Sequence, residues 1–266
     1  MDWDFKLSKA ESYEAYIVPA IFVQFTDALV TTARPRSGNR VLDVGCGTGI
    51  VSRVVAPIVG PSGRMVGLDI DLGMLSVARS LEPADGADFE WCHGDVAKMP
   101  FENAEFDLVL CQAALQFFPH KLAALREIRR VLAPPGRLVV SVFRSIERNP
   151  AFEVLARALE RHVSPEVGAM RRAIFALGEA EELLSLLVDV GFKDSKLSSV
   201  QEMVRFPSPE EFLRRQLASQ SPWVFDELDA KRLQALVGEV GTELRKFANE
   251  DGLSFPMEVH IVLAER

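Results

Sequence analysis

One segment of the sequence restricts the possible folds more than any other: the run VLDVGCGTG at residues 41–49. A short, mostly apolar stretch leads directly into Gly45, Gly47 and Gly49, and a helical pattern starts at Ile50. Glycines suit such a turn because a side chain would block a ligand from the backbone N–H groups and from the positive end of the following helix. The run predicts a strand, a ligand-binding turn and a helix, although a turn of this kind can also be purely structural.

The chain around this segment alternates between short apolar runs and helical patterns. Short apolar runs are typical of strands that are buried on both faces of a parallel sheet. They lie at residues 41–44, 65–68, 108–111 and 138–142, with helical patterns at 50–59, 72–81 and 121–132. This alternation predicts right-handed crossovers and an α/β fold with a doubly wound, mostly parallel seven-stranded sheet. Residues 88–93 alternate apolar and polar side chains, so we place that strand near an edge.

The remaining segments predict further helices and a final strand, in one domain overall. A capping box at residues 8–11 opens an N-terminal helix, and a helical period continues after Pro19 to about Ala33. Ser208 and Glu211 predict another helix start. We divide the chain into N-terminal helices at 1–37, a core at 38–143, a helical insertion at 144–178, a core helix and strand at 179–206, a second helical insertion at 207–252 and a final strand at 253–266.

The two insertions carry much apolar surface, including Phe152, Phe175, Phe212, Trp223 and Phe225. Ligands of doubly wound sheets bind at the carboxyl ends of the strands, and both insertions adjoin strands of the predicted sheet. We therefore expect a helical lid over that crevice. A dimerisation surface is the alternative, because exposed aromatic side chains also mark interfaces between subunits.

The spacing of the glycines separates two classes of nucleotide-binding protein. The dinucleotide fingerprint needs its third glycine at the position of Ile50, which disfavours a pyrophosphate ligand. Asp43 followed by Gly45-Cys46-Gly47-Thr48-Gly49 resembles the first motif of class I S-adenosylmethionine-dependent methyltransferases. The later motifs of that family follow in order, and the resemblance covers roughly residues 38–143. It implies the Rossmann-like methyltransferase fold, in which the last strand of the sheet is antiparallel.

The second motif of the resemblance is Gly67-Leu68-Asp69. In the family, an acidic residue at this strand end accepts hydrogen bonds from both ribose hydroxyls, and a carboxylate is well suited to bind a diol. Ile70 and Met74 would pack on the adenine ring. The alternative is an aspartate that caps the next helix.

The third motif, His93-Gly94-Asp95-Val96, resembles the family's adenine-edge motif. There, Asp95 would accept from the exocyclic amine and the backbone N–H of Val96 would reach the ring, although an aspartate in a turn often forms an Asx turn. By the same resemblance, the end of the strand at 106–112 lies beside the methionine portion of the cofactor. The cofactor residues implied are Asp43, Gly45, Cys46, Gly47, Gly49, Asp69, Ile70, Met74, Gly94, Asp95, Val96, Cys111, Gln112 and Gln116.

The likeness is greatest to small-molecule methyltransferases of the ubiquinone and menaquinone biosynthesis type, on the segment Leu115-Gln116-Phe117-Phe118-Pro119-His120. The resemblance implies in-line methyl transfer to a small or medium-sized, partly apolar acceptor. Phe117, Tyr13 and Tyr16 are candidates for contact with that acceptor, with core packing as the alternative. His120 is a candidate base, although a surface histidine at a helix start is the commoner case.

Two other functions stay open. A NAD(P)-dependent oxidoreductase would use the same fold and Asp69, but the chain lacks the expected third glycine and any Tyr-x-x-x-Lys pattern. A non-catalytic partner protein that only binds S-adenosylmethionine is the second alternative, although the complete set of motif residues argues against loss of activity.

Composition limits the partners and the location. With 30 Lys and Arg against 38 Asp and Glu, the net charge is −8, and we expect no nucleic-acid partner. The 3 cysteines match neither a disulfide framework nor a zinc motif, so we expect a reducing cytoplasm and no metal. The N-terminus lacks the basic start of a signal peptide, and the apolar run at 17–23 contains Pro19, so we expect no membrane insertion. A homodimer is possible.

Overall fold

The computed structural model describes residues 7–82, 87–220, 223–224 and 228–266. Phe225, one of the aromatic residues of the second insertion, lies outside them. The chain forms two compact units. Unit 1 contains Met1–Val23, Arg144–Ala176 and Gln201–Glu258, and unit 2 contains Gln24–Phe143, Leu177–Val200 and Val259–Arg266.

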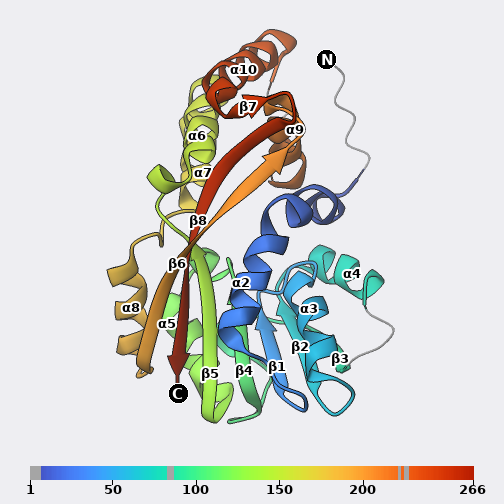
Figure 1. The fold of residues 1–266 in the computed structure, drawn as a ribbon, viewed down its shortest axis with the longest axis vertical. Helices are drawn as coiled ribbons and strands as arrows, with labels where there is room; N and C mark the ends of the chain where they lie inside the picture. The colour runs from blue at the N-terminus through green and yellow to red at the C-terminus, as the bar shows by residue number, and fades with distance from the viewer. Residues whose placement is uncertain (1–6, 83–86, 221–222, 225–227) are drawn as a thin grey trace. The chain divides into compact units, whose positions relative to one another are not determined.

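A mostly parallel sheet organises unit 2 (Figure 1). Its strands run in the order β3-β2-β1-β4-β5-β8-β6, and the short β7, whose residues belong to unit 1, pairs with β8. Neighbouring strands from β3 to β5 are parallel, whereas β8 runs antiparallel to β5. The strands are β1 (Arg40–Val44), β2 (Arg64–Asp69), β3 (Asp88–His93), β4 (Phe106–Gln112), β5 (Leu132–Phe143), β6 (Lys193–Phe206), β7 (Ala248–Asn249) and β8 (Gly252–Glu265). The doubly wound sheet, its seven main strands, the antiparallel last strand and the edge position of β3 are confirmed.

The helices of unit 2 bury their apolar stripes against this sheet. Leu125 and Ile128 of α5 and Leu183 of α8 are completely buried in one cluster with side chains of the central strands. Each such side chain contributes roughly 1.5–3 kcal/mol by leaving water. The helices are α2 (Val23–Ala33), α3 (Ile50–Val59), α4 (Leu72–Ser80), α5 (Lys121–Val131) and α8 (Ala180–Asp189).

Unit 1 is mainly helical, and its core is aromatic. The ring of Phe212 lies 5.1 Å from Phe206, 5.3 Å from Phe255 and 5.5 Å from Phe152 between centroids. Ser208 caps α9 as predicted, since its hydroxyl accepts from the N–H of Glu211. The helices are α1 (Lys9–Ser12), α6 (Pro150–His162), α7 (Pro165–Ala173), α9 (Pro209–Gln220) and α10 (Ala230–Glu243), with a 3₁₀ turn at Leu244–Phe247. The role of the insertions as a lid or as a dimer surface stays a prediction.

Pro19 does not interrupt the N-terminal helix. The capping box at Ser8 and Glu11 is present, and helix continues from Lys9 to Ala33 through a π-helix, η1 (Tyr13–Phe22). A proline cannot donate the usual hydrogen bond and clashes with the preceding turn of an α-helix, whereas the wider π-turn leaves room for its ring. The helical patterns predicted before and after Pro19 therefore belong to one continuous helix.

The uninterrupted helix also bears on the membrane prediction. Among the described residues, Lys9–Ala33 is the one stretch that is long and apolar enough to cross a bilayer by length and composition, and 39% of its most apolar window is buried. A core helix of a water-soluble protein and a signal sequence pass the same test. Length and composition alone therefore do not assign this helix to a membrane.

Candidate cofactor-binding site

The glycine-rich turn between β1 and α3 has a backbone that favours glycine. Gly45, Gly47 and Gly49 have φ angles of 65°, 57° and 86°, in the left-handed region where a side chain is strained. The N–H groups of Gly45 and Cys46 both donate to the carbonyl oxygen of Leu68, at 2.8 and 3.1 Å. The turn is thereby tied to the end of β2 next to it in the sheet.

Two close approaches also exclude side chains from this turn. A Cβ atom on Gly45 would lie 2.5 Å from the Cβ atom of Ala114, and one on Gly49 would lie 2.3 Å from the indole of Trp91. The same indole lies 2.4 Å from where a Cβ atom of Gly67 would be. Trp91 thus packs against the turn and against β2, where only glycines leave room for it.

Asp69 links the end of β2 to the turn. One carboxylate oxygen accepts from the N–H of Gly47 at 2.8 Å, and the other accepts from the N–H of Asp71 at 2.8 Å. Burial raises the pKa of Asp69, and hydrogen bonds from the backbone act against that rise. Asp71, rather than Asp69, caps α4 by accepting from Gly73 and Met74. A helix cap therefore does not account for Asp69.

Asp43 is a buried carboxyl group one residue from the end of β1. It is 1% exposed and accepts from the hydroxyl of Ser52 at 2.7 Å. Burial raises the pKa of Asp43 to about 7, with a further rise from the charge of Asp69, while the Ser52 hydrogen bond opposes it. A cation bound nearby would favour the ionised form of this group.

Asp95 follows β3 and stands at the start of a single 3₁₀ turn, η2 (Val96–Lys98). One of its carboxylate oxygens accepts from the N–H of Ala97 at 2.8 Å, so Asp95 does form the Asx turn that we considered as the alternative. The N–H of Gly94 donates to the backbone carbonyl oxygen of Asp69 at 3.0 Å. Hydrogen bonds therefore join the ends of β2 and β3, and with them the segments that carry the two acidic residues.

The end of β4 adds buried polar groups. The amide oxygen of Gln112 accepts from the hydroxyl of Thr26 at 2.9 Å, and the thiol of Cys111 is buried, which raises its pKa to about 12. Gln116 donates to the carbonyl oxygen of Ala113 at 2.9 Å, while its buried side-chain oxygen has no hydrogen-bond partner. The hydroxyl oxygen of Thr48, in the glycine-rich turn, is likewise buried and without a partner.

These two orphaned oxygens test whether the site fits a polar ligand. A buried polar atom without a partner costs free energy unless a ligand or water satisfies it. Thr48 lies in the turn, and Gln116 lies in the segment whose Ala114 packs on Gly45. Together with Asp43 and Asp69 they offer polar groups suited to the amino-acid and ribose portions of S-adenosylmethionine. The donor set and the glycine cradle therefore fit the cofactor that the sequence implies.

Other predicted residues lie at the surface of unit 2. Ile70 and Phe117 are 68% and 56% exposed, which leaves apolar area open to a ligand, and Met74 is half-buried. His120 is exposed and starts α5 without a side-chain capping bond. No described contact directs His120 at another site residue.

Tyr13 and Tyr16 belong to unit 1 rather than to the unit with the turn. The ring of Tyr13 lies 5.5 Å from that of Phe22, and the ring of Tyr16 lies about 5 Å from the guanidinium groups of Arg214 and Arg215. Each tyrosine therefore has packing partners within unit 1. Contact with an acceptor stays a prediction for both.

Sequence reasoning missed Thr48, Ser52 and Trp91. Thr48 stands between two predicted glycines, so its position was a usable signal. Ser52 lies nine residues after Asp43, and nothing in a helical pattern distinguishes it. Trp91 contacts glycines of two other elements, which leaves no trace in the sequence around it.

Comparison with known proteins agrees with this geometry. A family model described as a methyltransferase domain matches residues 42–140, which include the turn, Asp69, Asp95 and the end of β4.

Two curated relatives are ubiquinone/menaquinone biosynthesis C-methyltransferases. The one from Ectopseudomonas mendocina is 36% identical over 171 residues, which cover 59% of this chain and 66% of the relative. The one from Coxiella burnetii is 31% identical over 181 residues, which cover 63% of this chain and 72% of the relative. The matched part of the chain thus spans about two thirds of the length of these relatives.

A solved structure shows the same fold. It is the Haemonchus contortus phosphoethanolamine N-methyltransferase 2 in complex with S-adenosyl-L-methionine. The TM-score is 0.59 at 19% sequence identity, and the match covers 97% of this chain and 56% of that one.

Proposed function

Because this chain belongs to the S-adenosylmethionine-dependent methyltransferases, we propose that its glycine-rich turn and the adjoining strand ends hold that cofactor and that the chain methylates a small or medium-sized, partly apolar acceptor. The observation that carries the proposal is the Asp69 carboxylate, which binds the turn through Gly47 at 2.8 Å and does not cap α4.

At the adenosine end, Asp69 accepts from the ribose hydroxyls. Each of its oxygens already accepts one N–H and keeps a further lone pair, which a diol can use. Asp95 accepts from the exocyclic amine of adenine, and the backbone N–H of Val96, after Gly94, reaches the ring. The exposed side chain of Ile70 and the half-buried side chain of Met74 cover its faces.

At the methionine end, buried polar groups receive the charged amino acid. The roles fall to Asp43, to the orphaned oxygens of Thr48 and Gln116, and to the end of β4 with Cys111 and Gln112. A carboxyl group whose pKa lies near neutrality is well placed to ionise when a cation binds. The close packing of Gly45 on Ala114 keeps backbone, rather than side chain, against the ligand.

When bound, the cofactor supplies a methyl group that its positively charged sulfonium makes electrophilic. The thioether that remains after transfer is a good leaving group. The residues of this chain then need to hold that methyl group in line with the attacking atom and to exclude water. Orientation of this kind is worth up to roughly 7–11 kcal/mol. No dedicated base is required for a nucleophile that is already reactive, and His120 is left as a candidate only for acceptors that must lose a proton.

The relatives named C-methyltransferases make a carbon nucleophile the first acceptor class to test. The net charge of −8 supports an acceptor other than nucleic acid, because nucleic acids are bound through basic groups. The three free thiols support a reducing cytoplasm as the location. A homodimer is also part of the proposal, and sedimentation velocity of the purified chain tests it.

The proposal is tested by methyl transfer from radiolabelled S-adenosylmethionine to cell extract and to a panel of small aromatic and amine acceptors. We expect label in a small-molecule fraction, and calorimetric binding of S-adenosylhomocysteine but not of NAD or NADP. Binding of the nicotinamide cofactors alone would support the oxidoreductase. Tight binding of S-adenosylhomocysteine without transfer to any acceptor would support the non-catalytic alternative.

A further inference from the structure

The segment between β3 and β4, residues 94–105, is held in place by a helix far along the chain. Its regular structure is limited to η2, and the backbone groups of such an irregular segment need partners of another kind. Two hydrogen bonds between residues close in sequence fix its start. The carboxylate of Asp95 accepts from the N–H of Ala97, and the carbonyl oxygen of Asp95 accepts from the N–H of Lys98. Its end is held by a bond from the N–H of Glu102 to the carboxylate of Glu105 at 2.7 Å and by an ion pair of Glu105 with Arg64 at 2.6 Å. The part between them is held mainly by α5.

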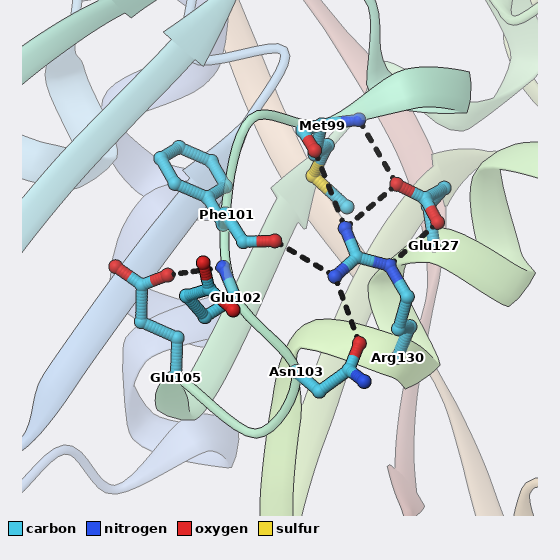
Figure 2. Close-up of polar contacts among 7 residues, drawn as sticks. All are labelled: Met99, Phe101, Glu102, Asn103, Glu105, Glu127 and Arg130. Atoms are coloured by element: carbon cyan, nitrogen blue, oxygen red, sulfur yellow. Dashed lines mark hydrogen bonds and ion pairs between the residues drawn. The ribbon is translucent and has the colours of Figure 1, made fainter.

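Arg130 of α5 supplies most of these bonds (Figure 2). Its guanidinium group donates to the carbonyl oxygens of Met99 and Phe101, at 3.3 and 2.7 Å, and to the side-chain oxygen of Asn103 at 3.0 Å. The backbone carbonyl oxygen of Arg130 accepts from the N–H of Ala104 at 3.0 Å. One residue therefore contacts the segment at four places.

Glu127, one turn earlier on α5, completes the arrangement. Its carboxylate accepts from Nε and Nη2 of Arg130, at 2.7 and 2.9 Å, and from the N–H of Met99 at 3.0 Å. The hydrogen bond with Arg130 lowers the pKa of Glu127, so this carboxylate stays ionised near neutrality. Met99 is thus bound at both its N–H and its carbonyl oxygen by the same ion pair.

A stretch of only three residues, 96–98, separates Met99 from Asp95. Val96 and Met99 are both buried in the core of unit 2, and η2 fills the interval between them. A displacement of Met99 would therefore shift the turn that Asp95 begins. We propose that Glu127 and Arg130 are positioning residues for Asp95, and that they set the preference of the site for adenine over other bases. This inference rests on the proposed function, which assigns Asp95 to the adenine amine.

The inference requires an arginine at position 130. A guanidinium group presents five donors in a fixed plane, whereas a lysine ammonium has three on a flexible stem. Arg130→Lys keeps the charge but cannot reach Met99, Phe101 and Asn103 together with Glu127. Glu127→Gln keeps the size of the side chain but removes the charge and one acceptor.

The readout is the ratio of the dissociation constants for S-inosylhomocysteine and S-adenosylhomocysteine. Hypoxanthine carries an oxygen where adenine has the amine, so the carboxylate of Asp95 loses a donor and faces an acceptor. For the unaltered chain we expect the adenosine compound to bind at least about 10-fold more tightly. Asp95→Asn, whose amide can donate to that oxygen, should lower or invert the preference.

Arg130→Lys should reduce the ratio of the two dissociation constants toward 1, and Glu127→Gln should reduce that ratio in part. Arg129→Lys is the matched control, because Arg129 lies on the same helix and donates to the carbonyl oxygen of Gly191 instead. It should leave the ratio unchanged. A general loss of stability would weaken the binding of both ligands equally and would leave the ratio of their dissociation constants unchanged. If Arg130→Lys fails to fold, Glu127→Gln carries the test.

The outcomes separate this inference from the proposed function. If the unaltered chain shows no preference, or if Asp95→Asn does not change it, the role of Asp95 is wrong and the inference is overturned with it. If Asp95→Asn acts as expected while Arg130→Lys and Glu127→Gln keep the ratio of the Arg129→Lys control, the inference alone is overturned.

Discussion

The glycine-rich turn follows β1 and the segment at residues 94–105 follows β3 of the same sheet, yet they are held by different means. Besides its hydrogen bonds to Leu68 and Asp69, the turn is fixed by close packing, since Gly45 and Gly49 leave no room for side chains against Ala114 and Trp91. The segment is fixed by hydrogen bonds from the side chains of Arg130 and Glu127.

Because of this difference, substitutions in the two regions should have different effects on stability and binding. Overpacking strains a backbone and costs stability as well as binding, whereas loss of a hydrogen bond shifts a segment that remains folded. We therefore expect changes in the turn to weaken every ligand of the site. Substitutions of the residues that hold the segment at 94–105 should instead alter the selectivity of the site for the base.

The largest effect is expected from Gly49→Ala. The added Cβ atom would meet the indole of Trp91 at 2.3 Å and would hold a positive φ, which together cost about 3 kcal/mol of stability or more. Gly38→Ala is the control, because Gly38 has a φ of 82° but only Ser62 nearby, at 3.6 Å. It should cost about 1 kcal/mol. Urea unfolding measures both, and equal losses would contradict the packing argument.

The pH dependence of folding stability should also differ between the two regions. Burial raises the pKa of Asp43 to about 7, above its value in the unfolded chain, so the folded state holds an extra proton between about pH 4 and 7. Stability should therefore fall as the pH rises through this range, by roughly 3 kcal/mol between pH 5 and 8. Glu127 has the opposite sign, because its lowered pKa gives stability that is lost only as the pH falls below the ordinary pKa of a glutamic acid.

Urea unfolding of the chain without ligand, repeated across pH 5 to 8, measures this dependence. Asp43→Asn removes the titrating group and should flatten the curve. An unchanged slope in Asp43→Asn would show that another group causes the dependence.

Asp69→Asn should lower the affinity for S-adenosylhomocysteine by about 10- to 100-fold, since a hydrogen bond to a charged group is worth roughly 1.5–3 kcal/mol. The variant should stay folded because an amide oxygen still accepts from Gly47. Asp71→Asn, two residues further on, is the control, because asparagine caps a helix about as well as aspartate. Calorimetry compares the two, and equal affinity for both variants would remove Asp69 from the ribose site.

The smallest effect is expected from Trp91→Phe. It removes the indole N–H that donates to Glu82 at 2.8 Å and part of the surface that packs on Gly49 and Gly67, at a cost of about 1 kcal/mol. Because phenylalanine is smaller, the same change should recover part of the stability lost by Gly49→Ala. Thermal unfolding of the double variant tests this, and strictly additive losses would mean that the two residues do not interact.

The same comparison shows how far the sequence could predict the structure. The turn is contiguous in sequence, and a doubly wound, mostly parallel sheet follows from alternation of strand and helix, so both were predictable. The contacts that fix residues 94–105 come from Glu127 and Arg130, and a helical pattern shows only that these residues lie off the apolar stripe. The π-helix through Pro19 was missed because its wider turn depends on packing rather than on local preference.

The most direct measurement of the central claim is a crystal structure of the chain with S-adenosylhomocysteine. The account predicts both ribose hydroxyls at about 2.6–3.2 Å from the carboxylate of Asp69, with the adenine amine at a similar distance from Asp95. A ligand bound away from the glycine-rich turn, or a ribose that does not contact Asp69, would contradict it.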